Sequence, residues 1–137
     1  MTVSRWALAP KALNDARSVG YSHAVASTGG CLIHVAGQVA DAATAAEQVE
    51  AALQAVDLCC REAGGSARDV VTMTWFTTED VADLWASTAD ARARFLGDPP
   101  PAATAVRVVA LADPRYLVEI SAVAVVEHPP SPVTSPG

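Results

Sequence analysis

One carboxylate in this sequence stands where apolar side chains are expected. Glu119 lies within the segment 117–126, in which almost every other residue is aliphatic. A carboxylate in such surroundings must accept hydrogen bonds, pair with a cation or shift toward its neutral form. Glu119 is therefore a candidate for orienting water or moving a proton in a cleft. The alternatives are a structural carboxylate paired with Arg107 on a neighbouring strand, or an edge position that faces water.

A tyrosine and a histidine form a second candidate group. Tyr21 and His23 are two residues apart after Gly20, so in an extended segment their side chains share one face and could act together on a proton. The alternative for His23 is a solvated loop histidine. Arg107 could clamp an anionic substrate, and its alternative is a strand arginine that faces solvent.

The segment 31–39 carries further polar positions. His34 has the pattern of a histidine satisfied within a sheet, and Gly37-Gln38 predicts a bulge or a close approach of the backbone. No metal motif, phosphate-binding loop, dinucleotide fingerprint or nucleophile elbow occurs, so we expect neither a metal nor another cofactor.

The three cysteines do not form a site by their spacing. Cys31, Cys59 and Cys60 match neither a disulfide framework nor a metal-ligand pattern. We interpret them as reduced core thiols of a cytosolic protein.

Two amphipathic helices are predicted to position these groups. Within 42–63 an apolar stripe recurs at helical spacing, and Gly64-Gly65 ends the helix where a left-handed cap is needed. The second helix is predicted after Thr78, with Glu79 and Asp80 in its first turn, and it ends at 97–101. The first stripe comprises Val49, Ala52, Leu53, Val56 and Cys60, and the second comprises Val81, Leu84, Trp85, Thr88 and Phe95.

Six strands complete the prediction, over residues 3–8, 22–27, 31–39, 70–76, 105–111 and 117–126. The turn residues 112–115 predict a hairpin that joins the last two. The order β-β-β-α-β-α-β-β implies an α+β fold, a mixed β-sheet with two helices on one face. Because both faces of the last strand are apolar, we expect a homo-oligomer that covers the face without helices.

Composition and charge limit the classes of function. The chain has 137 residues, 51% hydrophobic and 18% charged, which predicts one globular domain over 1–127 followed by a disordered Pro/Ser tail over 128–137. A net charge of -6 disfavours nucleic acid and anionic membrane surfaces as partners. With no membrane span and no signal peptide recognised, we expect a cytoplasmic protein.

Five segments together resemble the Rid/YjgF family of reactive intermediate deaminases. They run in the family's order and spacing from about residue 15 to 127. They are Tyr21-Ser-His-Ala-Val25, Cys31-Leu-Ile-His-Val-Ala-Gly-Gln-Val39, the helix from 48 with its exit at Ala63-Gly-Gly-Ser-Ala-Arg-Asp-Val-Val71, Phe95-Leu-Gly-Asp-Pro-Pro-Pro-Ala-Ala-Thr104, and Leu117-Val-Glu-Ile-Ser-Ala-Val-Ala124.

The resemblance implies a chorismate-mutase-like fold, a homotrimer and a ligand cleft at each subunit interface. Active members hydrolyse enamines and imines of small 2-amino acids. In them an arginine pairs with the substrate carboxylate, and a glutamate on the last strand helps position water. Glu119 falls on that glutamate and Tyr21 on the cleft tyrosine.

The sequence departs from the family pattern where the substrate carboxylate should be held. Ala103 stands where the family has its arginine, Ala36 replaces a serine, Ala89 falls where a helix asparagine often faces the pocket, and His23 replaces a glutamine. The lost contact is worth about 1.5–3 kcal/mol. Arg107 lies roughly 13 Å along an extended strand from Ala103, too far to replace it. These changes predict a larger, drier cavity for a bulkier or less acidic ligand.

Three functions follow as hypotheses. The first is a small-molecule enzyme in which Glu119, Tyr21 and His23 perform acid/base chemistry on an imine, enamine or related carbonyl intermediate, by hydrolysis, tautomerisation, dehydration or cyclisation. The second is a non-catalytic ligand-binding or protein-interaction trimer, and the third is deamination of 2-imino acids and enamines. The residues assigned to the substrate-binding walls are Gln38, Ala36, Ala103, Ala105, Trp85 and Arg107.

Overall fold

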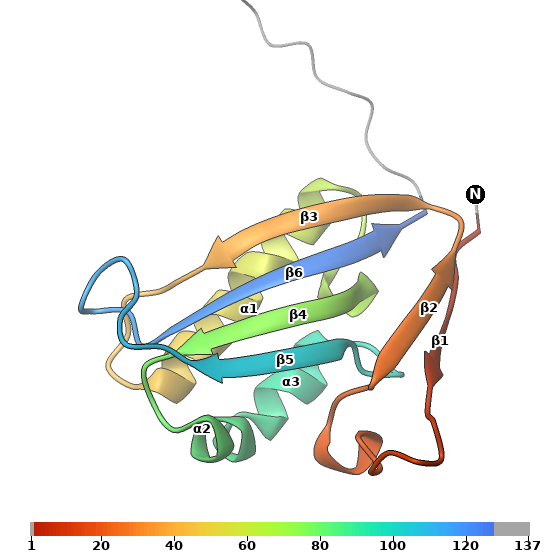
Figure 1. The fold of residues 1–137 in the computed structure, drawn as a ribbon. Helices are drawn as coiled ribbons and strands as arrows, with labels where there is room; N and C mark the ends of the chain where they lie inside the picture. The colour runs from red at the N-terminus through yellow and green to blue at the C-terminus, as the bar shows by residue number, and fades with distance from the viewer. Residues whose placement is uncertain (1, 128–137) are drawn as a thin grey trace, which may run out of the picture.

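The computed structural model describes residues 2–127 as a mixed β-sheet with helices on one face, which confirms the predicted α+β class (Figure 1). The predicted tail, 128–137, lies outside the described residues. The strands are β1 (Ser4–Leu8), β2 (Ala24–Thr28), β3 (Cys31–Gln38), β4 (Val70–Thr77), β5 (Ala102–Arg107) and β6 (Val118–Val126). The helices are α1 (Ala45–Glu62), α2 (Val81–Ser87) and α3 (Ala89–Phe95), with 3-10 turns η1 (Arg17–Val19) and η2 (Ala67–Asp69).

The first predicted helix is confirmed, and both of its ends have identifiable caps. The hydroxyl of Thr44 accepts a hydrogen bond from the backbone N–H of Glu47 at 3.2 Å. Gly64 adopts a φ of 88°, the left-handed conformation that lets the chain leave the helix. The predicted apolar stripe of α1 is buried against the sheet.

The second predicted helix is interrupted, so the prediction of one continuous helix is wrong. The Thr88 hydroxyl donates to the carbonyl of Leu84 at 2.8 Å, and its backbone φ of -114° leaves the helical region. A threonine side chain that bonds its own backbone competes with the helix in this way. The start also differs, because Asp80 is the cap of α2 and Glu79 precedes the helix.

The main sheet has the strand order β3-β6-β4-β5, in which β4 and β5 run parallel and the other neighbours antiparallel. The predicted hairpin of the last two strands is wrong, because β4 lies between them. The turn itself is present, since the N–H of Tyr116 donates to the carbonyl of Asp113 at 3.0 Å. The fifth strand also begins and ends earlier than predicted, at Ala102 and Arg107. β1 and β2 pair in a separate two-stranded sheet.

The central strand β6 separates two different environments. Val118, Ile120, Ala122 and Ala124 are buried beneath the helices, which Figure 1 shows behind the sheet. The alternate residues point to the opposite face, which no helix of residues 2–127 covers. On the same open face Leu32 of β3 is 59% exposed. The two sides of one strand therefore serve the core and an open surface.

The three cysteines are free but differ in exposure. Only Cys60 is fully buried, and burial raises the pKa of its thiol to about 11. Cys31 is half-buried and Cys59 is exposed, so the core-thiol interpretation is wrong for Cys59.

Within residues 2–127 no helix is both long and apolar enough to cross a membrane.

A buried glutamine joins α1 to the loop that leads into β6. Gln48 has an exposed fraction of 0%, and its amide nitrogen donates to the carbonyls of Ala42 at 3.0 Å and Arg115 at 2.9 Å. Its side-chain oxygen accepts from the N–H of Leu117 at 2.8 Å. The side chain thus satisfies three backbone groups and fixes where β6 begins.

Replacing this glutamine should weaken the fold strongly. We expect Gln48→Leu to lower the free energy of unfolding by about 2–4 kcal/mol, because backbone groups lose their partners in a buried place. The matched control is Gln54→Leu on the exposed face of the same helix, which should stay within about 0.5 kcal/mol of the wild type. Urea denaturation measures both, and equal stabilities for the two variants would contradict the role given to Gln48.

Candidate functional site

Glu119 lies on the open face of the sheet, near the start of β6. It is half-buried and sits opposite Phe76 of β4. Its carboxylate accepts no hydrogen bond from residues 2–127 and pairs with no cation among them. The two alternatives for Glu119 are therefore wrong: Arg107 is two strands away on β5, where its Nε donates to the carbonyl of Thr78, and β6 is a central strand rather than an edge.

The predicted bulge brings backbone up against this carboxylate. The register of β3 with β6 shifts between Val35 and Gln38, which confirms the bulge at Gly37. A Cβ atom at position 37 would lie 2.6 Å from Cδ and 2.7 Å from Oε2 of Glu119. Only glycine leaves room for the carboxylate where it now sits, so the bulge and Glu119 form one local unit.

Further along this face from Glu119 lie two hydroxyl groups and a histidine. Ser121 of β6 lies opposite Thr74 of β4, and His34 lies opposite Val123. A hollow of about 160 Å³ lies beside these residues and is lined by His34, Val35, Thr72, Met73, Thr74, Ser121, Ala122 and Val123. Hydroxyl groups of this kind can hold water near a carboxylate.

Gln38 and Ala36 lie near Glu119, at the end of β3. The side-chain nitrogen of Gln38 donates to the carbonyl of Ala36 at 3.0 Å, across the bulge. Gln38 pairs with Ile120, which is buried on the helix side, so the register places Gln38 on the side of the sheet away from Glu119. Of these two predicted wall residues, only Ala36, which follows the buried Val35, lies on the same side of the sheet as Glu119.

Tyr21, Trp85, Ala103 and Ala105 line a separate hollow on the helix side of the sheet. This hollow, which we call the Tyr21 groove, has a volume of about 410 Å³. The Tyr21 ring makes edge contacts with Trp85 at 6.3 Å and with His23 at 5.6 Å between ring centroids. The lining residues are Val19, Tyr21, Val81, Ala82, Trp85, Ala86, Ala103 and Ala105.

His23 lies beside the Tyr21 groove, and one of its ring nitrogens is engaged in a hydrogen bond. Its Nε2 lies 2.8 Å from the carbonyl oxygen of Asn14. Because a carbonyl only accepts, Nε2 must carry the proton, which leaves Nδ1 as the nitrogen able to accept one. The close contact of His23 with Tyr21 fits the expectation that they share one face.

One chain does not bring Glu119 and Tyr21 together. Ala103 and Ala105 pair with Met73 and Trp75, whose side chains are buried in the core under the helices. Glu119 pairs with Phe76, and alternate residues of a strand point to opposite faces. The predicted site residues therefore form two groups on the two sides of the sheet, and Arg107 belongs to neither.

Sequence reasoning missed a buried arginine next to the Tyr21 groove. Arg92 of α3 is 8% exposed, and its guanidinium carbon lies 3.7 Å from the ring centroid of Trp85. Its Nη1 donates to the Trp85 carbonyl at 2.5 Å and to the Thr88 hydroxyl at 2.9 Å. Burial lowers the pKa of Arg92 to about 10. The helical spacing Leu84, Thr88, Arg92 places it on the buried stripe, which is the pattern that could have found it.

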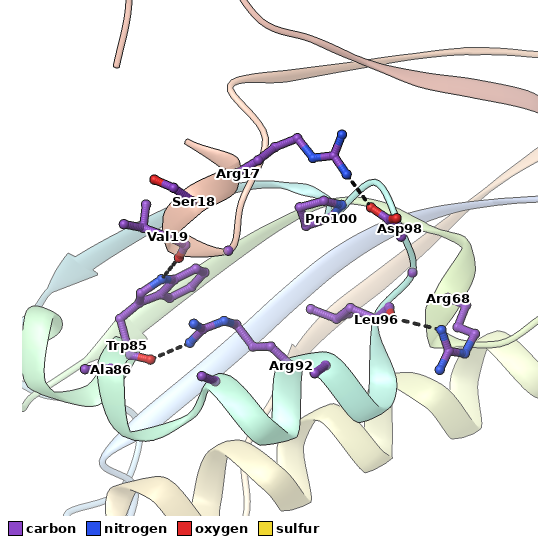
Figure 2. Close-up of a pocket in the computed structure, with 14 residues that line it drawn as sticks. Arg17, Ser18, Val19, Arg68, Trp85, Ala86, Arg92, Leu96, Asp98 and Pro100 are labelled. Atoms are coloured by element: carbon purple, nitrogen blue, oxygen red, sulfur yellow. Dashed lines mark hydrogen bonds and ion pairs between the residues drawn. The ribbon is translucent and has the colours of Figure 1, made fainter. Parts of the chain in front are cut away.

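Arg92 lines the larger hollow drawn in Figure 2, which we call the Arg92 pocket, with a volume of about 650 Å³. The pocket lies between η1 and the helices α2 and α3, and Trp85 borders both this pocket and the Tyr21 groove. At its edge, Arg17 forms an ion pair with Asp98 at 2.7 Å. Ala89 lines this pocket rather than the Tyr21 groove, and Ala36 lines neither, so the three alanines do not enlarge one cavity within a chain.

Metal ligands are not gathered in the part of the chain that the structure describes. Among residues 2–127 no group of three or more His, Cys, Asp or Glu side chains is arranged to hold an ion.

Comparison with known proteins identifies the family. The sequence profile described as Endoribonuclease L-PSP matches residues 11–126, so the chain belongs to that family, whose solved members carry the names Rid and YjgF. A protein of unknown function of the conserved Rid family, YyfB from Yersinia pestis, is 30% identical over 89% of this chain and 98% of its own, with a TM-score of 0.78.

Two further solved structures are similar. A member of the YjgF family from Mycobacterium tuberculosis is 30% identical over 91% of this chain and 100% of its own, with a TM-score of 0.63. RidA from the Antarctic bacterium Psychrobacter is 29% identical over 77% of this chain and 88% of its own, with a TM-score of 0.63. These likenesses confirm the resemblance and the chorismate-mutase-like fold. Comparison with curated proteins gave no match.

The contact between Gly37 and Glu119 can be tested by stability alone. A methyl group at position 37 would overlap the carboxylate, so we expect Gly37→Ala to push it aside and to cost about 1 kcal/mol. In a Glu119→Ala background the obstacle is gone, and the same substitution should cost nothing measurable. Denaturation of the four proteins gives this coupling energy. An equal cost of Gly37→Ala in both backgrounds would contradict the contact.

Proposed function

We propose that this chain is a small-molecule enzyme of the Rid type, in which Glu119 performs acid/base chemistry on an imine, enamine or related carbonyl intermediate. The observation that carries the proposal is the state of Glu119: a half-buried carboxylate on a central strand, without a partner among residues 2–127 and held beside the Gly37 bulge. A carboxylate that only stabilised the fold would use its oxygens in hydrogen bonds or ion pairs.

Hydrolysis of an imine illustrates what the side chain would do. Glu119 takes a proton from water as the oxygen bonds to the carbon of the C=N group. The π electrons of the C=N bond move to its nitrogen, which takes up a proton and gives a carbinolamine. The nitrogen then gains a second proton, the hydroxyl group loses its proton, and the C–N bond breaks to yield a carbonyl compound and an amine. Tautomerisation, dehydration and cyclisation need the same acid/base group and remain part of the proposal.

Two copies of the chain are needed for the proposed site. Because Glu119 and Tyr21 lie on opposite sides of the sheet, a cleft that contains both takes Glu119 from one subunit and Tyr21 from its neighbour. The open face carries apolar side chains that another subunit would cover, among them Leu32, 59% exposed, and Val106, 38% exposed. We propose a cytoplasmic homotrimer of the single domain 1–127, with clefts between subunits and no nucleic-acid partner.

The lining of the Tyr21 groove supports a substrate that is bulkier or less acidic than a small 2-imino acid. Tyr21, Trp85, Ala103 and Ala105 contribute aromatic rings and methyl groups, and no cation is among the lining residues. Without a guanidinium at Ala103, a carboxylate loses a contact worth about 1.5–3 kcal/mol. Deamination of small 2-imino acids is therefore the least favoured of the activities.

The second candidate is a ligand-binding or protein-interaction trimer without catalysis. Ala103 favours it, because the anchoring residue of the family's active members is missing. Binding of a ligand without chemical change, with equal affinity in the wild type and Glu119→Gln, would select this candidate.

The proposed shared site can be tested by mixing two inactive variants. Imines generated in situ by oxidation of amines and amino acids serve as substrates. Carbonyl release reports hydrolysis, and deuterium uptake from solvent reports tautomerisation. We expect Glu119→Gln and Tyr21→Phe each to lower kcat about a hundredfold or more. After co-refolding in equal amounts, about a quarter of the sites should combine an intact Glu119 with an intact Tyr21 and restore that share of activity.

Two controls make this result decisive. Glu119→Gln co-refolded with itself should recover nothing, and the exposed substitution Gln54→Leu should not change kcat. If both variants are inactive and their mixture stays inactive, the two residues do not act across an interface. If Glu119→Gln and Tyr21→Phe both keep full activity on a substrate that the wild type converts, the catalytic proposal is wrong.

A further inference from the structure

We propose that the Arg92 pocket is a binding site for a carboxylate attached to an apolar body, with the guanidinium of Arg92 as the group that recognises the carboxylate. This site lies on the helix side of the sheet and goes beyond the proposed chemistry at Glu119, on which it does not depend.

Arg92 is a buried cation without a counter-ion. It is 92% removed from solvent, being 8% exposed, and no carboxylate of residues 2–127 forms an ion pair with it. A buried charge is normally paired, since its desolvation is costly. Burial also lowers the pKa of Arg92 to about 10. An anion that entered the pocket would supply the missing counter-charge.

The free edge of the guanidinium faces the hollow. Arg92 uses Nη1 for the Trp85 carbonyl and the Thr88 hydroxyl, while Nε and Nη2 donate to no acceptor among residues 2–127. Nε and Nη2 form the edge of an arginine that binds a carboxylate through two parallel hydrogen bonds. A Cβ atom at Gly20 would lie 3.2 Å from Nη2 and 3.6 Å from Nε, so the absent side chain keeps this edge open.

Charge and shape define the class of ligand. Arg17, Arg68 and Arg92 line the pocket with one carboxylate, Asp98, which is already paired with Arg17. The local excess of positive charge contrasts with the net charge of -6 of the whole chain. The remaining wall is mostly apolar and includes Val19, Trp85, Ala86, Ala89, Ala93 and Leu96. A volume of about 650 Å³ is that of a small-ligand site.

A purely structural role would not require this arrangement. The bond from Nη1 to the Trp85 carbonyl satisfies the end of α2, and the stacking on the indole fixes the side chain, as Figure 2 shows. Neither contact needs the Nε and Nη2 edge to border a hollow. The open edge is therefore the feature that points to a ligand.

Benzoate and its neutral analogue benzamide are the probes for calorimetric titration of the wild-type chain. We expect benzoate to bind saturably and about tenfold or more tightly than benzamide, because only the anion forms two charge-assisted hydrogen bonds.

The variant Arg92→Met should lose this preference for benzoate over benzamide. Since Arg92→Met also removes the bond to α2, a second variant, Ala89→Asp, leaves Arg92 in place. Position 89 is three residues before 92 on α3, so the new carboxylate can pair with the guanidinium and exclude benzoate.

The matched control is Gln54→Glu, which adds the same charge on the exposed face of α1 and should bind benzoate like the wild type. Ala89→Asp should weaken benzoate binding about tenfold or more without lowering the melting temperature, because an acid in the first turn of a helix is favourable. Absence of saturable benzoate binding, equal binding of benzamide, or unchanged affinity in Ala89→Asp would overturn the proposal. Tighter binding of inorganic phosphate than of benzoate would overturn the ligand class. Glu119→Gln should bind benzoate normally, so this result is separate from the test of catalysis.

Discussion

The alternation of side chains along β6 is the constraint on which the rest of this structure depends. The helices cover one face of the sheet, so Val118, Ile120, Ala122 and Ala124 must all point into the core. Glu119 is then directed to the opposite face, whatever its chemistry. Gln48 fixes this register by bonding the loop where the strand begins. A shift of one residue would bury the carboxylate and expose the core.

The same constraint explains why a proposed site needs more than one chain. The Tyr21 groove opens on the helix side of β5, and Glu119 stands on the open side of β6. A neighbour that covers the open face would both remove apolar surface from water and bring a second set of site residues near the carboxylate. The same contact between subunits would thus stabilise the oligomer and complete the proposed site.

Trp85 is a residue that lines both hollows on the helix side, the Tyr21 groove and the Arg92 pocket. Its indole N–H donates to the carbonyl of Val19 at 2.6 Å, which holds η1 against α2. The indole ring lines the Tyr21 groove together with Tyr21, Ala103 and Ala105. The guanidinium of Arg92 stacks on the same ring from α3. The chain therefore holds a buried guanidinium beside the groove, whose own lining residues include no cation.

Local sequence patterns predicted helices, helix ends and the bulge correctly where interactions between residues close in the chain determine them. The apolar stripe of α1 and its end at Gly64 follow from helical period and from the backbone freedom of glycine, and the bulge at Gly37 follows from the missing side chain. The interruption at Thr88 was not predicted, because whether a threonine hydroxyl bonds back to its helix depends on what packs around it. Arg92 was missed because the charge of an arginine argues for the surface, while its position on the stripe argues for burial.

The sequence by itself determined the class of fold, the faces of the helices and the identity of the unusual carboxylate, since these depend on residue type and spacing. Only the tertiary structure decided that β4 separates β5 from β6, because the turn at Asp113 is formed equally well between strands that are not neighbours. Only the tertiary structure placed Glu119 and Tyr21 on opposite sides of the sheet and Arg92 beneath Trp85. Strand order and side-chain burial arise from contacts between residues far apart in the chain, and no local pattern encodes them.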